Sequence, residues 1–356
     1  MMCNTWGMTD FSEKLIISRV ENGTGVLELN RPRALNSLNP EMIDVIDECL
    51  RAWADDDAVS QVIVYSNSPK GFCAGGDVRY ARDAVQSGTP ELADKFFADE
   101  YKMNGDLHHF SKPYIALIDG VAMGGGLGIS VHGSHRVVSE KAFAAMPEMA
   151  IAYIPDVGVP FMLQRMVGGK GYASPALALF LVTTGWRLSP ADMLWSGVAT
   201  DFVSSENMES LRQAIIEKGI DAALSDYATE VAEESELAKW IDDIEATFVH
   251  GSWPQVLDAV KNHGNESFAN MVYEHIAASS PSALVAATEL MAVAAECSDI
   301  REELECERKL GEVIRIEPDF VEGVRAVLVD KARDASWNPP TVESVDPKKY
   351  RAIVRG

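Results

Sequence analysis

The sequence predicts an α/β fold whose last third is mainly helical. Up to about residue 203, short β-rich runs alternate with segments whose apolar residues recur at helical spacing, an alternation typical of α/β proteins. Beyond residue 205 the strand signal fades, and amphipathic helical segments follow one another. A chain of 356 residues suffices for about two folding units. We therefore expect a core over residues 1–205 and a helical region over residues 206–356 that packs on it.

The first two elements have the clearest local signals. Residues 15–30 contain two β-rich runs around Asn22-Gly23, a dipeptide that favours the tight turn of a hairpin. Asn39 and Pro40 then supply an N-cap and a first helical residue. Apolar residues follow at helical spacing over 42–53, so the sequence predicts a hairpin and then an amphipathic helix.

The later elements repeat strands, turns and helices. Buried strands are predicted at 61–65 and 114–119, a short strand at 136–139 and a helix at 90–110. The proline-rich segment 337–356 is expected to lie over the surface. The amphipathic helices predicted for the C-terminal region span 211–224, 236–248, 281–296 and 303–316.

The charge balance limits the partners of this chain. Fifty-four acidic residues against 31 basic ones give a net charge of −23, which repels duplex nucleic acid and anionic membranes. An anionic metabolite needs only a local basic pocket, so the charge does not exclude such a ligand. The sequence also lacks the run of about 18 apolar residues that a membrane span needs. We therefore expect neither a nucleic-acid partner nor a membrane.

Cysteine usage indicates a reducing compartment. The chain has no CxxC pair, and no HExxH spacing occurs among its seven histidines. We therefore expect no disulfide framework and no metal site. The first residues show no basic segment followed by an apolar one, as a secretory signal has, so the predicted location is the cytoplasm. The five scattered cysteines are Cys3, Cys49, Cys73, Cys297 and Cys306.

Two glycine-rich turns follow predicted strands, CAGGD at 73–77 and MGGGLG at 123–128. Without side chains, such turns let a ligand approach backbone N–H groups closely. Two N–H groups that converge on one oxygen can stabilise a developing negative charge. The alternative is that the glycines serve only tight turns or close helix packing. Neither run has the spacing of a dinucleotide or P-loop fingerprint.

Two acidic residues, Glu148 and Asp156, lie in a segment that is otherwise apolar from Ala142 to Phe161. Apolar surroundings raise the pKa of a carboxyl group toward neutrality, and such a group suits proton transfer. The alternative is that both acids merely cap helices. For Asp156 this alternative is supported by Pro155 before it, at an expected helix start.

Four motifs in sequence order resemble those of the crotonase (enoyl-CoA hydratase/isomerase) superfamily. They are LNRPRALNSLNPEMI at 29–43, GFCAGGDVR at 71–79, KPYIALIDGVAMGGGLGIS at 112–130 and FAAMPEMAIAYIPDVG at 143–158. Within the superfamily, the MPE and PDVG pair and the segment at 319–331 are similar to the 3-hydroxyisobutyryl-CoA hydrolase subfamily. The resemblance implies a spiral of repeated ββα turns with helices outside and a helical C-terminal region.

The resemblance also implies roles for single residues. The backbone N–H groups of Gly76 and Gly125 correspond to the oxyanion hole for the thioester carbonyl. Glu148 matches the catalytic glutamate, and Asp156 matches the aspartate of the hydrolases. Gly125, Glu148 and Asp156, together with Glu100, match positions that contact the substrate. The positions that match the CoA-binding part of the family are Arg31, Arg33, Ala34 and Ala74.

Two positions depart from the family pattern. Hydratases carry a second glutamate soon after the triple glycine, and this chain has Gly128 at that place. The hydrolase subfamily usually continues PDVG with another glycine, whereas this chain has Val159-Pro160. The first departure removes one partner of a water addition, and the second bears on the acyl group that is accepted.

The resemblance implies a hydrolase of a short branched 3-hydroxyacyl-CoA thioester, which converts 3-hydroxyisobutyryl-CoA to the free acid and CoA, as in valine catabolism. Glu148 either attacks the carbonyl carbon or activates water, and Asp156 positions a water or the substrate hydroxyl, or transfers a proton. The thioester is already activated and CoA arrives with the substrate, so no cofactor is expected.

Two other functions stay open at this point. The first is an enoyl-CoA hydratase or isomerase on the same fold, which Gly128 disfavours. The second is a non-catalytic acyl-CoA-binding protein, which the presence of both Glu148 and Asp156 disfavours. A homo-oligomer is compatible with each of these functions.

Overall fold

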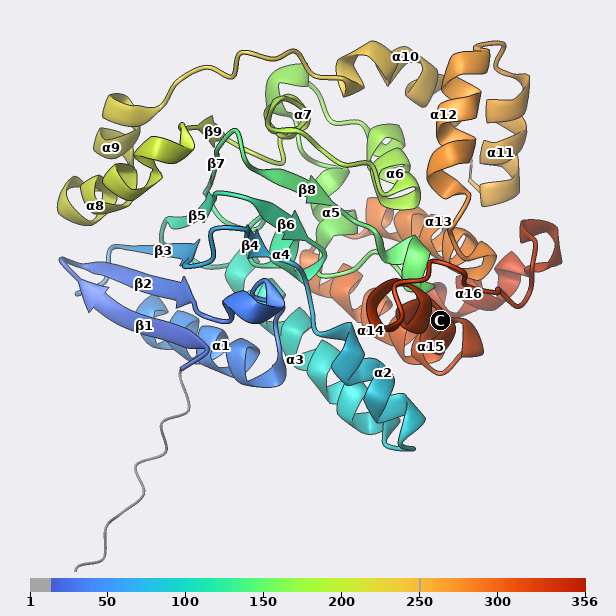
Figure 1. Cartoon of the computed structure of the whole chain (residues 1–356), viewed down its shortest axis with the longest axis horizontal. Helices are drawn as coiled ribbons and strands as arrows, with labels where there is room; N and C mark the ends of the chain where they lie inside the picture. The colour runs from blue at the N-terminus through green and yellow to red at the C-terminus, as the bar shows by residue number, and fades with distance from the viewer. Residues whose placement is uncertain (1–13, 250) are drawn as a thin grey trace, which may run out of the picture.

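The computed structural model describes residues 14–249 and 251–356, in which the strands form two sheets (Figure 1). The order of the six-stranded sheet is β1-β2-β3-β5-β7-β9, and that of the three-stranded sheet is β4-β6-β8. The strands of the larger sheet are β1 (Ile16–Glu21), β2 (Thr24–Leu29), β3 (Gln61–Ser66), β5 (Tyr114–Ile118), β7 (His135–Val138) and β9 (Asp201–Phe202). Those of the smaller sheet are β4 (Gly71–Cys73), β6 (Val121–Met123) and β8 (Phe143–Ala145).

Consecutive strands alternate between the two sheets, and this alternation makes the spiral. After the antiparallel β1–β2 hairpin, β3, β5 and β7 enter the larger sheet in parallel, and each is followed by a strand of the smaller sheet. β4, β6 and β8 also pair in parallel. The repeated ββα turn confirms the predicted fold.

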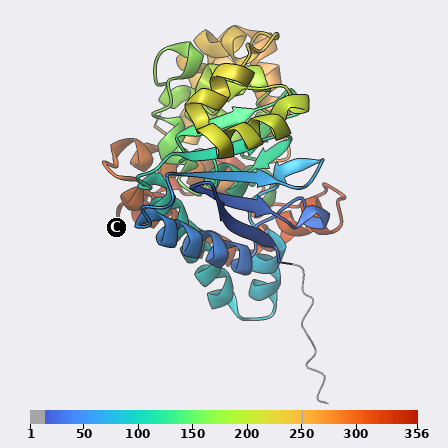
Figure 2. The ribbon, with the colours of Figure 1, turned by 90° about the vertical axis from the view of Figure 1, so that its left-hand side faces the viewer.

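Helices cover both faces of the larger sheet. In β2 and β3, Leu27 and Val62 belong to the main apolar cluster with α1 (Pro40–Ala54), whereas their neighbours Val26 and Ile63 face the other way. That second face packs against α8 (Met208–Lys218) and α9 (Ile220–Tyr227), as Figure 2 shows. Burial on both faces explains why residues 62–65 form a continuous apolar run.

The remaining helices and turns of the core connect the strands to one another. The single-turn helix α4 follows β6 directly, and α5 follows the segment that contains Glu148 and Asp156. The bounds are α2 (Val78–Gln86), α3 (Pro90–His108), α4 (Gly125–Gly128), α5 (Val159–Leu163), α6 (Pro175–Thr184) and α7 (Pro190–Ser196).

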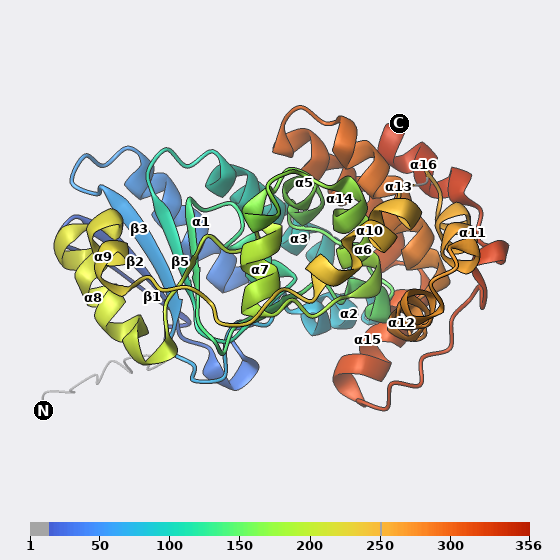
Figure 3. The same cartoon turned by 90° about the horizontal axis from the view of Figure 1, so that it is seen from above.

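The C-terminal region is helical, as predicted, and its main body gathers on one side of the sheets (Figure 3). A single apolar cluster runs from Ile16 to Val354, so residues before and after 205 share one core. The helices are α10 (Leu237–Thr247), α11 (Trp253–Asn262), α12 (Glu266–Ile276), α13 (Pro281–Glu296), α14 (Ile300–Arg315), α15 (Pro318–Val324) and α16 (Pro347–Arg355).

Two sequence predictions for this region were wrong. The helix expected over 211–224 is two helices, because Gly219 between them has a φ of +84°. The tail expected to lie over the surface ends in α16, which buries Tyr350 and Val354 against α13 and α14. Its amphipathic spacing outweighs the prolines that precede it.

Two sequence predictions concern residues that are only partly described. Cys49, Cys73, Cys297 and Cys306 are free thiols, as predicted, whereas Cys3 and the segment judged for a secretory signal lie outside the described residues. Within residues 14–249 and 251–356, no single helix has the length and apolar character of a membrane span. Only α12 and α13 taken together, which meet at 110°, match such a span in length and composition.

Candidate active site

The ends of the three short strands bring the predicted site together. β4, β6 and β8 run in parallel with Cys73 opposite Ala122 and Met123 opposite Ala145. Their carboxyl ends therefore lie at one edge, where the chain continues into Gly76, Gly125 and Glu148 respectively. Residues that are far apart in the sequence become neighbours because each turn of the spiral ends at this edge.

The glycines at this edge leave no room for side chains. A Cβ atom on Gly125 would lie 3.0 Å from the backbone nitrogen of Gly76 and 2.5 Å from Oε1 of Glu100. A Cβ atom on Gly124, whose φ is +45°, would lie 2.7 Å from Oε1 of Glu148. Both interpretations of the glycines, as a requirement of tight turns and as part of a ligand site, are therefore compatible with the structure. The glycines allow the turns, and they bring two backbone N–H groups beside two carboxyl groups.

Two carboxyl oxygens at this edge lack a hydrogen-bond partner among the described residues. These are Oε1 of Glu100, on α3, and Oε2 of Glu148, at the start of the 3-10 turn η2 (Glu148–Ile151). Burial raises the pKa of both groups well above the usual value, and the negative charge of Asp156 raises it further. Buried polar atoms usually have partners, so unpartnered oxygens here suit a ligand or a water.

Asp156 has a different environment from the two glutamates. Its carboxyl group is buried, and the Tyr101 hydroxyl donates a hydrogen bond of 2.8 Å to its Oδ2. Burial raises the pKa of Asp156 to about 7, against the lowering effects of this hydrogen bond and of the Arg315 charge. The capping alternative was wrong, because α5 begins at Val159 with Gly158 as its N-cap and has no side-chain cap.

The Gly128 position is closed by the segment that carries Asp156. A Cβ atom on Gly128 would lie 2.7 Å from Cβ of Val157 and 3.0 Å from Nδ2 of Asn104. Val157 has a φ of +58°, which is strained for a β-branched residue. The departure from the hydratase pattern therefore has a structural cause, since a glutamate does not fit where Val157 packs.

The residues predicted to hold CoA border the first glycine turn. The Ala74 nitrogen donates to the carbonyl of Leu35 over 3.0 Å, which places the loop containing Arg33 and Ala34 beside that turn. The Arg31 guanidinium lies 2.9 Å from the carboxylate of Asp77, which caps α2. Arg33 is exposed, so it is the cation of this loop that has its charge available for a ligand.

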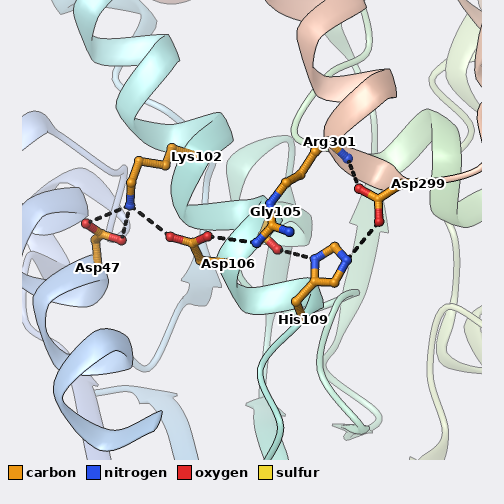
Figure 4. Close-up of polar contacts among 7 residues, drawn as sticks. All are labelled: Asp47, Lys102, Gly105, Asp106, His109, Asp299 and Arg301. Atoms are coloured by element: carbon orange, nitrogen blue, oxygen red, sulfur yellow. Dashed lines mark hydrogen bonds and ion pairs between the residues drawn. The ribbon is translucent and has the colours of Figure 1, made fainter. Parts of the chain in front are cut away.

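On the side facing away from the site, charged residues of α3 pair with residues of α1 and α14, as Figure 4 shows. Lys102 bridges Asp47 of α1 and Asp106 over 3.0 and 2.8 Å, and Arg301 of α14 reaches Asp106 over 3.2 Å. His109 lies 2.9 Å from Asp299. These contacts fix the helix whose inner side presents Glu100 and Tyr101 to the site.

Sequence reasoning missed five residues around Asp156. All five are buried side chains with a polar group near Asp156, and Tyr101 is next to the predicted Glu100 in the sequence. In α14, two acids four residues apart lie on the side that also buries Leu304 and Leu310, and this helical spacing was the available signal. The five residues are Tyr101, Tyr153, Glu303, Glu307 and Arg315.

No metal-binding arrangement occurs in the part of the chain that the structure describes: no group of three or more His, Cys, Asp or Glu side chains could hold an ion there. Cys73 is buried in the first glycine turn, with its Sγ 3.1 Å from the carbonyl of Asn36. Burial raises the pKa of this thiol to about 12, so it fills space and is not a thiolate nucleophile at neutral pH.

Comparisons with known proteins identify the family of this chain. A family model described as enoyl-CoA hydratase/isomerase matches residues 24–354. The chain belongs to this family. A relative named 3-hydroxyisobutyryl-CoA hydrolase, mitochondrial, from Xenopus tropicalis is 38% identical over 331 residues, which are 90% of this chain and 83% of the relative.

Solved structures of the family confirm the fold. A carnitinyl-CoA dehydratase from Mycobacterium thermoresistibile is 33% identical with a TM-score of 0.88, and the match covers 96% of each chain. An enoyl-CoA hydratase from Rhodobacter sphaeroides is 31% identical with a TM-score of 0.85, over 96% of this chain and 97% of the other. Family members with this fold thus include proteins named for thioester hydrolysis and others named for water addition or removal.

Proposed function

We propose that this family member hydrolyses a short branched 3-hydroxyacyl-CoA thioester, with 3-hydroxyisobutyryl-CoA as the expected substrate. The observation that carries the proposal is the placing of Asp156 beside Glu148 while Gly128 is closed by Val157. The likeness to 3-hydroxyisobutyryl-CoA hydrolases supports it. Degradation of valine is the corresponding physiological role.

The backbone N–H groups of Gly76 and Gly125 form the oxyanion hole of the proposed reaction. They come from adjacent turns, and a Cβ on Gly125 would approach the Gly76 nitrogen to 3.0 Å. The thioester oxygen enters between them and gains negative charge as the carbonyl carbon is attacked. Fixed donors at that point stabilise the transition state more than the substrate, and each contributes about 10²–10³-fold to the rate.

The acids share the proton work because they differ in acidity. Asp156, with its pKa near 7, receives a hydrogen bond from Tyr101 and holds negative charge more readily than Glu148. Glu148, beside the second glycine turn, passes its proton to Asp156 and then, as a carboxylate, attacks the carbonyl carbon or activates the water that does so. A neighbouring protonated carboxyl group can supply the proton that the departing CoA sulfur needs.

The CoA moiety extends over the edge formed by Ala34 and Ala74, with Arg33 available for its phosphates. Water is the only co-reactant of a thioester hydrolysis, so the proposed reaction needs no metal and no further cofactor. The predicted location in the cytoplasm, assembly into homo-oligomers and absence of a membrane partner stay predictions.

A hydratase or dehydratase is the second candidate, because both solved structures above carry such names. Water addition to a conjugated double bond needs one carboxyl group to activate water and another to deliver the α-proton. The place of the second glutamate is Gly128, and Val157 occupies the space beside it. This closure favours hydrolysis over hydration.

The test uses the purified protein with 3-hydroxyisobutyryl-CoA, 3-hydroxypropionyl-CoA, acetyl-CoA and crotonyl-CoA. Release of free thiol is followed with a colorimetric reagent, beside the loss of enoyl absorbance for crotonyl-CoA. We expect fast thiol release from the branched hydroxyacyl substrate and little hydration. Fast hydration with negligible thiol release from every ester contradicts the proposal and supports the second candidate.

A further inference from the structure

A chain of three hydrogen bonds joins a buried arginine to Asp156. Nη1 of Arg315, at the end of α14, donates to the Tyr153 hydroxyl over 2.7 Å, and the Tyr153 and Tyr101 hydroxyls are 3.0 Å apart. The Tyr101 hydroxyl donates to Oδ2 of Asp156 over 2.8 Å. The Tyr101 hydroxyl uses its proton in the bond to Asp156, so in the bond between the two tyrosines Tyr153 is the donor. Each of the three bonds therefore donates in the direction of the carboxylate.

A glycine in α14 leaves room for this chain of hydrogen bonds. A Cβ atom on Gly311, in the middle of α14, would lie 2.6 Å from both Nη1 of Arg315 and the Tyr153 hydroxyl. Glycine is unfavourable inside a helix, so its presence here has a packing reason. The side chain of Arg315 is 1% exposed, and its guanidinium carbon lies 4.5 Å from the centre of the Phe97 ring.

One face of α3 carries the other contacts of Arg315. Asp94, Phe97 and Tyr101 recur at helical spacing on this face. Asp94 pairs with Arg315 over 2.6 Å, and the Phe97 ring lies against its guanidinium. Tyr101 is the last link of the hydrogen-bond chain to Asp156. Phe97 also stacks on Tyr153 with ring centres 5.1 Å apart. The cation is therefore fixed by α3 and α14 together.

The surroundings of Asp156 are otherwise rich in acids. Burial raises the pKa of Glu303 to about 8, and that of Glu307 is also raised by burial and by Glu303. His132, which donates to the Val157 carbonyl over 2.8 Å, stays neutral because burial lowers its pKa to about 3. The titratable and charged groups facing Asp156 are Glu100, Tyr101, Glu148, Tyr153, Glu303, Glu307 and Arg315.

We infer that Arg315 is a positioning residue of this site, which acts through Tyr153 and Tyr101 to hold the Asp156 carboxylate oriented and negatively charged among the buried acids. Arg315 is the cation of that group, and the two hydroxyls connect it to Asp156 by hydrogen bonds. The role in catalysis rests on the proposed hydrolysis, whereas the effect on Asp156 does not.

The first measurement is the pH dependence of kcat/KM for wild type, Arg315→Met, Arg315→Lys and Tyr153→Phe. Without the cation, Asp156 binds its proton at higher pH, so the acid limb of the profile moves to higher pH. Relative to wild type, we expect Arg315→Met to lose roughly tenfold at about pH 6 and at most threefold at about pH 9. Tyr153→Phe should change the profile in the same direction, and Arg315→Lys should restore part of it.

The matched control is Arg308→Met, which removes an arginine of α14 that pairs with Glu305 and Glu312 on the surface. It should leave the profile unchanged. An equal loss at all pH values for Arg315→Met and Tyr153→Phe shows a purely structural role and overturns the inference.

The second measurement does not need activity. Aspartate labelled with ¹³C at the side-chain carboxyl carbon, assigned with an Asp156→Asn variant, reports the titration midpoint of Asp156 by NMR. We expect a higher midpoint in Arg315→Met and Tyr153→Phe than in wild type. Equal midpoints overturn the inference even where hydrolysis is observed, and a shifted midpoint in a protein without hydrolysis contradicts only the proposed function.

Discussion

The two sides of the contact between α3 and α14 carry similar residues in opposite electrostatic states. On the outer side, Asp106 and Asp299 face Lys102, Arg301 and His109, as Figure 4 shows. Hydrogen bonds from these partners lower the pKa of both aspartates, although burial opposes the effect. On the inner side, burial raises the pKa of every acid around the site.

The difference shows that charge type alone does not indicate function in this chain. Acids on or next to α3 and α14 lie on both sides, and the two helices approach closely at Gly105, where a Cβ would lie 3.3 Å from Leu304. The outer carboxylates have charged partners and are partly exposed to solvent, so replacing one of them should lower the free energy of unfolding only slightly. Inner carboxyl groups lack both, so their protonation can change during a reaction.

The largest effect is expected for Glu148→Gln on the inner side. The amide keeps the size of the side chain and removes the group that serves as base or nucleophile, so kcat should fall by about 10²–10⁴-fold. Binding of a CoA ester, measured by calorimetry, should persist. The control is Glu296→Gln, which changes an exposed acid paired with Arg355. Near wild-type kcat in Glu148→Gln removes this residue from the mechanism.

Gly125→Ala should have the next largest effect. The new Cβ meets Glu100 and the Gly76 nitrogen at 2.5 and 3.0 Å and displaces the second N–H donor. We expect about a 10²-fold loss in kcat, the scale for one oxyanion-hole donor. Gly169→Ala is the control, because a Cβ there meets Trp195 at an ordinary 3.6 Å. A folded variant with full kcat makes Gly125 a packing residue only.

The stability of the protein should depend on pH in opposite directions for inner and outer acids. The raised pKa values of Asp156 and Glu303, about 7 and 8, mean that the native state retains protons that the unfolded chain releases above about pH 4. Their contribution to stability is therefore present below about pH 4 and is lost as the pH rises to about 8.

Glu303→Gln removes one of these groups, so thermal melts should show a gain of roughly 1–3 kcal/mol near pH 8 and little change near pH 4. A matched outer variant, Asp299→Asn, should lose stability at neutral pH instead, because its pKa is lowered by hydrogen bonding. Parallel melting curves for both variants contradict the proposed difference between the sides.

Lys102→Ala should have the smallest effect. The ammonium group is half exposed and its two carboxylate partners remain solvated, so the loss in stability should stay below about 1 kcal/mol. The acid limb of the kcat/KM profile should not move. A shift of that limb as large as the one expected for Arg315→Met shows that the outer charges also reach the site.

Local patterns predicted the alternation of strands and helices, whereas the spiral was implied only by the resemblance, and the short strands β4, β6 and β8 were not predicted. The turn at Asn22-Gly23 and the N-cap at Asn39 are confirmed, and the glycine turns meet Glu148 as expected. The apolar segment around Glu148 and Asp156 indicated proton transfer, and the resemblance supplied the separate role of each residue.

The rest depends on contacts between distant segments. Arg315 reaches Tyr153 across 162 positions, and Glu307 accepts a hydrogen bond from Gly158 across 149. The spacing of the acids in 303–316 is compatible with their burial, but it does not identify Asp156 as the group near which they and Arg315 lie. Helical spacing predicts which side is buried, and only the packing of α14 against α3 shows what that side contacts.

The most direct test of the account is the fate of the water oxygen. The wild-type protein is incubated with 3-hydroxyisobutyryl-CoA in water enriched in the heavy oxygen isotope, and the products are analysed by mass spectrometry. The account predicts free CoA and 3-hydroxyisobutyrate that carries the heavy oxygen in its carboxylate. CoA that stays esterified, with water lost from or exchanged at the β-carbon, contradicts it.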